Sequence, residues 1–233
     1  MIPVVVFTRV NGKDFYNHGA QRWVESYVKF RPSVPHRVVI IDRYADSPDD
    51  LFAAVADQHV RYDGGGWDCG AWQFAGRNIP ADLLICFNSS THLTGPGWME
   101  RIIESVEANG EGLYGPLSSL ENQPHIRTPC MIFQPKVIKK YPHEVTSRED
   151  TYRFESMGWP DGTQNFTLWA RSVRLKTMLI TWSGCYDLPD WRRPNVFRDG
   201  DQSDLMVFDR HCEAYAGSNP EGKDYLERLA NGK

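Results

Sequence analysis

Residues 82–98 read DLLICFNSSTHLTGPGW. The run 83–87 is apolar throughout and predicts a strand that is buried on both faces. Trp98 opens a helical pattern of apolar residues that stops at Asn109-Gly110, because glycine readily ends a helix. A buried strand followed by a polar loop and a helix is the repeating unit of a parallel sheet covered by helices.

The same alternation runs through the first 110 residues. Apolar and β-branched runs predict strands at 3–7, 37–42, 59–62 and 82–87. Apolar residues at helical spacing predict helices over 20–28, 71–79 and 98–106. Ser47-Pro48-Asp49-Asp50 is a typical helix start, with Leu51, Phe52 and Val55 on the apolar face. This pattern predicts an α/β fold with a Rossmann-like, mostly parallel central sheet covered by helices on both faces.

The second half of the chain is less regular. Strands are expected at 113–115, 130–133 and 177–181, and helices from Pro135 and over 166–173. Residues 187–203 are polar and rich in Arg, Asp and Pro, which predicts a long loop. No linker, repeat or low-complexity tract divides the chain. We therefore expect one domain over 1–233, with an irregular C-terminal portion.

The composition excludes several classes of protein. With 26 basic and 30 acidic residues, the 233-residue chain has a net charge of −4, unlike a protein that binds nucleic acid over a basic surface. No apolar run reaches the ~20 residues of a membrane helix, and the first residues do not form a secretory signal. The five cysteines are far apart, which argues against disulfides and zinc knuckles. We expect a cytoplasmic protein with reduced thiols.

Common catalytic motifs are absent from the sequence, which has no GxxxxGK loop, no GxGxxG after the first strand, no GxSxG and no HExxH. Ligands of open parallel sheets bind beyond the carboxyl ends of the strands, so the polar residues at those ends are the candidates for a site. They are Thr8, Arg9, Asp42, Arg43, Asp63, Asp68, Gly70, Asn88, Ser89, Ser90, Thr91 and His92.

The segment 87–98 resembles the strand, loop and helix of GT-A glycosyltransferases of the family-2-like branch. In those enzymes an apolar strand runs into Asp-x-Asp, and Pro-Gly-Trp opens the next helix; here the segments are Phe87-Asn88-Ser89-Ser90-Thr91 and Gly95-Pro96-Gly97-Trp98. Residues 68–78 are similar to the family's Asn-x-Gly segment and Ala-Arg-Asn helix. Residues 115–117, 130–133 and 159–162 fall where the family has its acceptor-side strands and acidic motif. The resemblance covers residues 1 to about 183.

The resemblance implies a single GT-A domain that transfers a sugar from a nucleotide sugar, its co-substrate, to a hydroxyl of a glycan, a protein or a modified base. Residues 1–110 would form the nucleotide-sugar-binding half, and 111–233 the acceptor-side half and C-terminal tail. Asp42 and Asp68 would hold the nucleotide base and ribose, and Asp161 would be the catalytic base. Further candidates are Thr8, Arg9, Gly70, Arg77, Asn88, Ser89 and Ser90 toward the donor, and Trp98 and Trp159 toward the sugar and acceptor.

The sequence departs from the family at the metal site. A divalent cation, Mn²⁺ or Mg²⁺, prefers anionic oxygen ligands, and Asn88-Ser89-Ser90 supplies none. Either the cation is held elsewhere, or cationic side chains such as Arg9 and Arg77 stabilise the leaving diphosphate. The candidate metal ligands are Ser90, His92, Asp209 and His211. We expect weak or absent dependence on divalent cations.

Two other functions stay open. The missing carboxylates also fit a GT-A-like module that binds nucleotide sugars or glycans and has lost catalysis. A glycosyltransferase acting on modified DNA would need a local basic strip, for which the candidates are Arg171, Arg174 and Lys176, or Arg192-Arg193.

The role of Asp161 also has an alternative. Asp is a favoured N-cap residue, so Asp161 could cap the helix that follows it. The base would then be expected among Glu155, Asp187 and Asp190.

Overall fold

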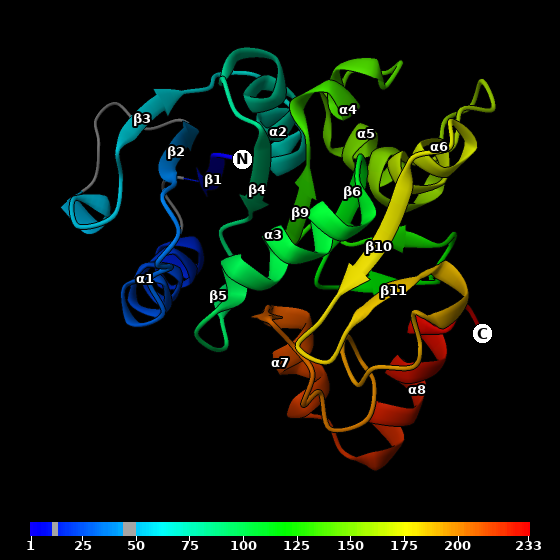
Figure 1. Ribbon diagram of the computed structural model, residues 1–233. Helices are drawn as coiled ribbons and strands as arrows, with labels where there is room; N and C mark the ends of the chain where they lie inside the picture. Colours follow the sequence, from blue (N-terminus) through cyan, green and yellow to red (C-terminus); the bar gives the residue numbers. More distant parts are fainter. Residues whose placement is uncertain (11–13, 44–49) are drawn as a thin grey trace.

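The core of the computed structural model, which describes residues 1–10, 14–43 and 50–233, is an eight-stranded sheet (Figure 1). Its strand order is β11-β10-β6-β9-β4-β1-β2-β3. The bounds are β1 (Pro3–Val10), β2 (Arg37–Arg43), β3 (Gln58–Arg61), β4 (Leu83–Phe87), β6 (Gly112–Gly115), β9 (Cys130–Phe133), β10 (Lys176–Ile180) and β11 (Cys185–Asp187). The pairs β1–β2, β1–β4, β2–β3 and β6–β10 are parallel, whereas β9 and β11 are antiparallel to their neighbours. The sheet is therefore mixed and mostly parallel, which confirms the predicted class.

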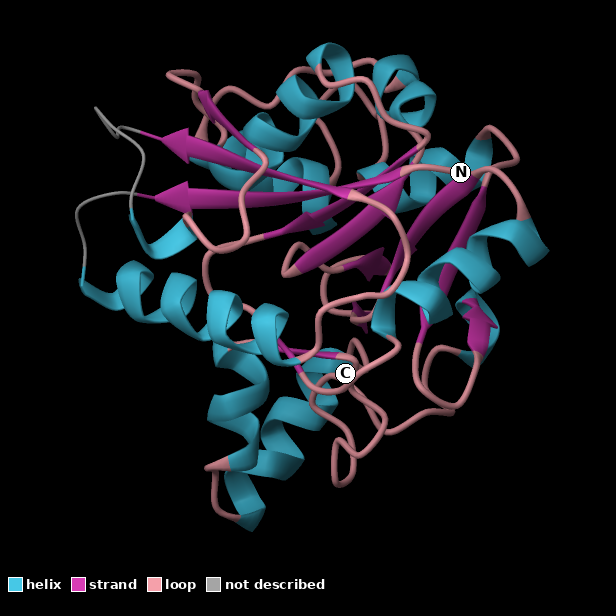
Figure 2. Ribbon diagram, turned by 60° about the vertical axis from the view of Figure 1, so that its left-hand side comes forward, coloured by secondary structure: helices cyan, strands magenta, loops and turns pink. Residues whose placement is uncertain are grey.

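Helices cover both faces of this sheet (Figure 2). They are α1 (Asp14–Lys29), α2 (Trp67–Asn78), α3 (Trp98–Asn109), α4 (Pro135–Lys140), α5 (Arg148–Tyr152), α6 (Phe166–Ser172), α7 (Arg210–Ala216) and α8 (Pro220–Ala230). Successive strand residues point to opposite faces, so Val4 and Val6 pack with α2, α4 and α6, while Val5 and Phe7 pack with α1 and α3. This explains why the strands are apolar without interruption.

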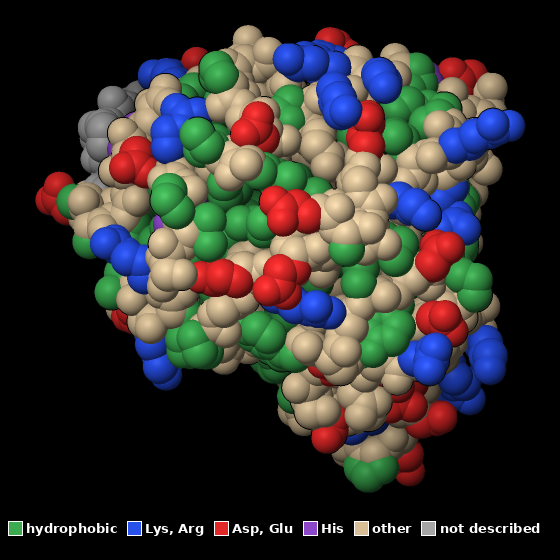
Figure 3. Space-filling view, in the orientation of Figure 1, with side chains coloured by type: hydrophobic (Ala, Val, Ile, Leu, Met, Phe, Trp, Pro, Cys, Tyr) green, Lys and Arg blue, Asp and Glu red, His purple; other side chains and the backbone are tan. Residues whose placement is uncertain are grey.

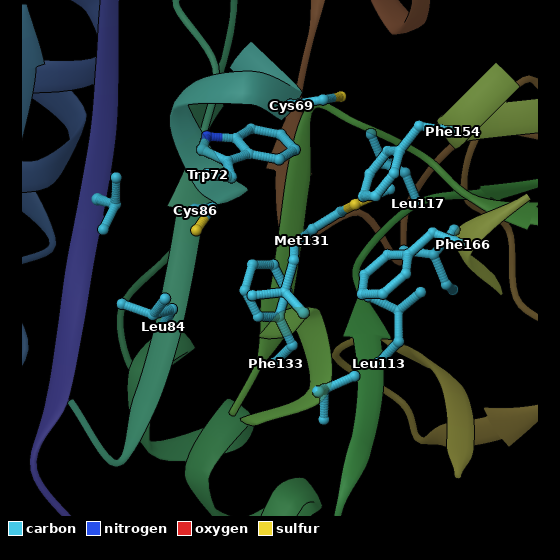
Figure 4. Packing of buried hydrophobic residues seen from close by; sticks show 14 of the residues in the cluster. Cys69, Trp72, Leu84, Cys86, Leu113, Leu117, Met131, Phe133, Phe154 and Phe166 are labelled. Carbon is cyan, nitrogen blue, oxygen red and sulfur yellow. The ribbon is translucent and has the colours of Figure 1, made fainter. Parts of the chain in front are cut away.

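Close packing on the first of these faces fixes α2 against β4 (Figure 4). Trp72 of α2 is fully buried in the same cluster as Leu84 and Cys86 of β4. In the second half of the chain, Phe154 and Phe166 stack with their ring centroids 4.7 Å apart. Burying an aromatic side chain contributes roughly 1.5–3 kcal/mol, so these contacts hold the start of α2 in a defined place.

Two short antiparallel pairs lie outside the main sheet. In one, β5 (His92–Leu93) pairs with β12 (Val207–Phe208), so the loop after β4 lies beside the C-terminal portion. In the other, β7 (Ser118–Ser119) pairs with β8 (His125–Ile126). These two-residue strands were not predicted, because two residues show no periodicity.

Two predicted features differ from the structure. Residues 47–49 of the expected helix start lie outside the described residues, and the part that is described forms only a 3₁₀ turn, η1 (Asp50–Phe52), which ends before Val55. The C-terminal portion contains a second 3₁₀ turn, η3 (Leu188–Asp190), and irregular backbone as expected, but it then forms α7 and α8. Asp209 and Asn219 cap these helices through their side chains, a local signal that favours helix starts.

The segment 148–157 was also not predicted. It forms α5 and then a π-helical turn, η2 (Arg153–Met157). π-Helical turns are rare and occur often at functional sites. Among the described residues, no helix combines the length and apolar character needed to cross a membrane.

Candidate functional site

A cavity of about 360 Å³ opens at the carboxyl end of β4. Asn88–Ser90, which follow β4, line it beside residues 127–129, which precede the antiparallel β9. The backbone N–H of Asn88 donates to the Pro129 carbonyl at 3.1 Å, so these two segments lie side by side. The strand order changes direction between β1 and β4, where ligands of α/β sheets commonly bind, and the cavity lies at the end of one of these strands, on its β9 side.

The remaining walls come from segments far apart in the sequence. Residues 67–69 begin α2, residues 151–156 lie in α5 and η2, and residues 209–211 begin α7. The β5–β12 pair brings the last of these to the cavity. Further lining residues are Glu121, Asn122, His125 and Arg198.

Backbone geometry places the start of α2 at the cavity. Gly66 has φ +74°, and a Cβ there would lie 2.1 Å from the Val145 carbonyl oxygen, so only glycine fits. Trp67 follows with φ +49°, a conformation that is uncommon for a bulky residue. This turn directs Trp67 and Asp68 into the lining of the cavity.

Asp68 is a carboxylate without a partner. It forms no hydrogen bond or ion pair with any described residue, and its Oδ1 is shielded from solvent. Burial raises the pKa of Asp68 to about 7, although Arg43 and Arg210 act in the opposite direction. Leaving a shielded carboxylate oxygen without a hydrogen bond costs stability. Carboxylates with strongly shifted pKa values occur often at functional sites.

Glu155 is a second carboxylate in the lining, and it is firmly held. Its Oε1 accepts both the backbone N–H and the hydroxyl of Thr128, at 3.0 and 2.8 Å. Burial acts to raise the pKa of Glu155, but Arg127, His125 and the Thr128 hydrogen bonds together lower it below its ordinary value. Glu155 therefore stays ionised at neutral pH.

Three arginines share the lining with these carboxylates: Arg127, Arg198 and Arg210. His211 lies between two of them, since its Nδ1 is 3.4 Å from Arg198 Nη2 and its Nε2 is 3.3 Å from Arg210 Nε. Burial and then Arg127 lower the pKa of His211 to about 4, so the ring is neutral at pH 7.

The Asn88–Ser90 loop, where the resemblance places a divalent cation, offers no anionic oxygen. Asn88 Oδ1 accepts the backbone N–H and the hydroxyl of Ser90, both at 2.9 Å, so this loop closes on itself with neutral groups. Asp209 Oδ1 accepts two N–H groups of α7, and both ring nitrogens of His211 face guanidinium groups. In the part of the chain that is described, no three His, Cys, Asp or Glu side chains group to hold a metal ion.

The structure brings six of the residues singled out in the sequence to this cavity. They are Asp68, Asn88, Ser89, Ser90, Asp209 and His211. Sequence reasoning missed Trp67, His125, Arg127, Tyr152 and Arg198, and it gave Glu155 only as an alternative.

The strand-end residues nearest the N-terminus lie outside the lining. Thr8 is buried and accepts the Trp72 indole N–H at 3.1 Å. Arg9 and Asp42 pair with each other at 3.1 Å, and His59 Nδ1 lies 2.7 Å from the second oxygen of Asp42. Their proposed contact with the nucleotide stays a prediction.

Three further candidates have structural partners elsewhere. A Cβ on Gly70 would lie 2.1 Å from the Gly65 carbonyl oxygen, which explains the glycine by packing. Arg77 pairs with Glu144 at the surface. His92 lies on β5 against the Phe208 ring, with burial lowering its pKa, and does not line the cavity.

Asp161 also lies outside the lining of the cavity, with a side chain that is 56% exposed. Its Oδ1 accepts the Thr163 backbone N–H at 2.9 Å, and its Oδ2 is 3.0 Å from His143 Nε2. These hydrogen bonds, that of Thr163 first, lower the pKa of Asp161. The alternative capping role is wrong, because α6 begins at Phe166 and its cap is Asn165, which accepts the Leu168 N–H.

The two tryptophans expected near the sugar and acceptor pack elsewhere. Trp98 is 1% exposed, and its indole donates to the Phe30 carbonyl at 3.0 Å. Trp159 stacks on His143 with ring centroids 4.1 Å apart. The aromatic side chains that do line the cavity are Trp67 and Tyr152, both exposed and in edge-to-face contact at 6.3 Å.

Comparison with solved structures finds chains that share part of this arrangement. HddC from Yersinia pseudotuberculosis is 18% identical, with a TM-score of 0.47, and the match covers 70% of this chain and 87% of HddC. Two structures of TarS from S. aureus are 11% and 13% identical, each with a TM-score of 0.45 over 65% of this chain. The matches cover 53% and 32% of the TarS chains.

These scores lie below 0.5 at low identity, so they assign neither a family nor an activity. Comparisons with protein-family profiles and with curated proteins found no match.

Proposed function

We propose that this chain transfers a sugar from a nucleoside diphosphate sugar to an acceptor hydroxyl, with the reaction taking place in the cavity at the end of β4. The observation that carries the proposal is that one cavity is lined by both an unpartnered carboxylate, Asp68, and a buried guanidinium, Arg127. Transfer of this kind needs a base for the acceptor and positive charge for the leaving diphosphate. The GT-A resemblance of 87–98 supports the same reading.

The bonds that form and break during transfer define the role of Asp68. The acceptor oxygen forms a bond to the anomeric carbon and loses its proton to Asp68. The bond from the anomeric carbon to the diphosphate oxygen breaks, and its electron pair stays on the nucleoside diphosphate. A base works best when its pKa lies near the working pH. The pKa of Asp68, about 7, meets this condition at neutral pH.

We assign the base to Asp68 rather than to Asp161, the candidate from the sequence. Asp161 is exposed, does not line the cavity, and has a lowered pKa that weakens it as a base. Glu155 has a lowered pKa as well, and its Oε1 is occupied by Thr128. Asp187 and Asp190, the other candidates, pair with Arg171 and Arg193 outside the lining.

For the acceptor we propose a contact with Trp67 and Tyr152. Arg148 contacts both rings, with its guanidinium carbon 5.2 and 5.6 Å from their centroids, and so holds the pair in place. Exposed aromatic faces at a cavity stack well on sugar rings. The strained φ of Trp67 fits a residue that is kept for binding rather than stability.

Three of the five basic candidates for DNA binding form ion pairs with acids. Arg171 pairs with Asp187, Arg192 with Asp199 at 2.7 Å, and Arg193 with Asp190 at 3.5 Å. On the face drawn in Figure 3, acidic and basic side chains are interspersed. A glycan or protein hydroxyl is therefore favoured over a modified base in duplex DNA.

The test is consumption of nucleotide sugars. The protein is incubated with UDP-, GDP- and dTDP-sugars, and release of the nucleoside diphosphate is followed by mass spectrometry, first with water as acceptor and then with simple glycosides. Release from at least one donor, lost in Asp68→Asn, supports the proposal. Binding of a nucleotide sugar without release from any donor would favour the inactive module instead.

A further inference from the structure

Arg127 is a buried cation without an ion pair. Its side chain lines the cavity, and the residue is 8% exposed. No carboxylate of the described residues lies within ion-pair distance of its guanidinium, and its Nε has no hydrogen-bond partner among them. Its guanidinium carbon lies 3.8 Å from the centroid of the Phe197 ring. Removing a charge from water is expensive unless an opposite charge compensates it.

Arg198 lies beside the same ring, with its guanidinium carbon 4.9 Å from the Phe197 centroid. Its side chain is 11% exposed, its Nε also has no partner among the described residues, and its ion pair with Glu121 is a long one at 3.4 Å. Burial and then the charge of Arg127 lower the pKa of Arg198. The two guanidinium groups therefore repel each other across a shared pocket.

Arg198 is held in this position at a cost to the backbone. Its φ is +47°, which a residue other than glycine or asparagine rarely adopts. Strain of this kind is kept only where the surroundings impose it, and it concentrates at ligand sites.

Among the described residues, Glu121 is the acid that pairs with Arg198, and no acid lies within ion-pair distance of Arg127. Glu155 acts on Arg127 from beyond ion-pair distance, and its Oε1 accepts from Thr128. Asp209 caps α7 through its Oδ1, and its Oδ2 forms no hydrogen bond with a described residue. His211, which touches Arg198, is neutral. An anion with several oxygens would satisfy both Nε–H groups and relieve the repulsion at once.

We propose that Arg127 and Arg198 bind the diphosphate of the donor, in the place where the resembled enzymes hold a divalent cation. This assignment rests on the proposed function. It adds that arginine side chains supply the positive charge that stabilises the diphosphate. Arginine suits the task because its planar guanidinium binds phosphate oxygens in a bidentate way. The site recognises a diphosphate group, whether free or as part of a nucleotide.

The experiment is calorimetric titration in the presence of EDTA, with inorganic pyrophosphate, UDP and GDP as the probes. We compare the wild type with Arg127→Gln, Arg127→Lys and Arg198→Asn; asparagine tolerates the positive φ at 198. Arg77→Gln is the matched control, since Arg77 forms a surface pair outside the cavity. Thermal unfolding confirms that each variant is folded.

We expect at least one nucleoside diphosphate to bind without metal. Its affinity should fall roughly 10- to 100-fold in Arg127→Gln and Arg198→Asn, the range for one charged hydrogen-bonding group, and stay unchanged in Arg77→Gln. Arg127→Lys should lose part of the affinity, because lysine keeps the charge but not the bidentate geometry.

Three results would overturn the inference in distinguishable ways. Binding that appears only with Mn²⁺ or Mg²⁺, and is unaffected by Arg127→Gln, removes the arginine site but leaves the proposed function. Binding of pyrophosphate with no nucleotide binding makes the site one for free diphosphate. In that case, and also where none of the probes binds with or without metal, the proposed function is contradicted as well.

Discussion

Thr128 donates both its backbone N–H and its hydroxyl to the same carboxylate oxygen of Glu155, at 3.0 and 2.8 Å. Thr128 lies just before β9, and Glu155 lies in the π-helical turn η2, so the contact joins two segments that are distant in sequence. It fixes a negative charge in the cavity lining, where Arg127 helps to lower the pKa of that carboxylate.

This geometry predicts how stability depends on pH. Because the pKa of Glu155 is lower in the folded protein than its ordinary value of 4.5, its ionised form stabilises the fold above about 4.5. That stability is lost as the pH falls through the lowered pKa. Glu155→Gln should therefore reduce the free energy of unfolding by about 1–3 kcal/mol at neutral pH, and the difference from wild type should shrink toward acid. Urea unfolding at several pH values measures it, and a difference independent of pH would contradict the assignment.

For Asp68, the dependence of folding stability on pH has the opposite sign. Its pKa is raised from 3.8 to about 7, so folding loses stability as the pH rises between those values. Asp68→Asn should therefore melt at a higher temperature than wild type at pH 8, and this gain should diminish toward pH 4. A variant less stable than wild type at pH 8 would show that the carboxylate is satisfied in the folded protein.

The same substitution tests the base. Transfer should fall roughly 10²- to 10⁴-fold in Asp68→Asn, the usual contribution of a general base, while nucleotide affinity is retained. The wild-type rate should rise with pH to a plateau above about 7, where the carboxylate is ionised. An unchanged rate, or a loss of nucleotide affinity equal to the loss of rate, would assign Asp68 to binding instead.

Asp161→Asn is the matched comparison. Asn can keep the turn at Thr163, and the site lies outside the cavity lining. We expect transfer within about twofold of wild type, since nothing that touches the donor or acceptor changes. A drop of ~10²-fold or more would return the catalytic role to Asp161, as the sequence suggested.

The aromatic pair predicts an effect on the acceptor alone. Trp67→Ala should raise the acceptor KM by roughly 3- to 10-fold, matching about 0.5–1.5 kcal/mol for an aromatic contact, with donor affinity unchanged. Trp159→Ala removes an aromatic ring that stacks on His143 outside the lining, and should leave this KM unchanged. Equal effects of the two substitutions would refute the placement of the acceptor.

The strands and main helices could be predicted because their signals are local. Each of β1, β2 and β4 is an apolar run, and α3 ends at Asn109 beside Gly110 as its sequence predicts. The order of polar residues after β4 placed Asn88, Ser89 and Ser90 at the cavity by topology alone.

The rest of the site depends on contacts that leave no local pattern. Arg127 reaches the cavity because β9 runs antiparallel to β4, and the Asp209–His211 segment does so through a two-residue strand pair. Arg9 and Arg77 were natural candidates for a diphosphate, but each has an acid as its partner, and only the fold reveals those pairs. An unpaired buried arginine is visible only when every neighbour is known.

The central claim is that a nucleoside diphosphate sugar binds in the cavity at the end of β4, and hydrogen–deuterium exchange of the intact protein tests it most directly. With the donor that the release assay identifies, we predict slower exchange in residues 66–70, 88–91, 127–129 and 198–211, and no such change in Arg127→Gln at the same concentration. Protection of these segments that persists in Arg127→Gln would remove the arginine site but leave the cavity as the binding site. Protection confined to other segments would contradict the account.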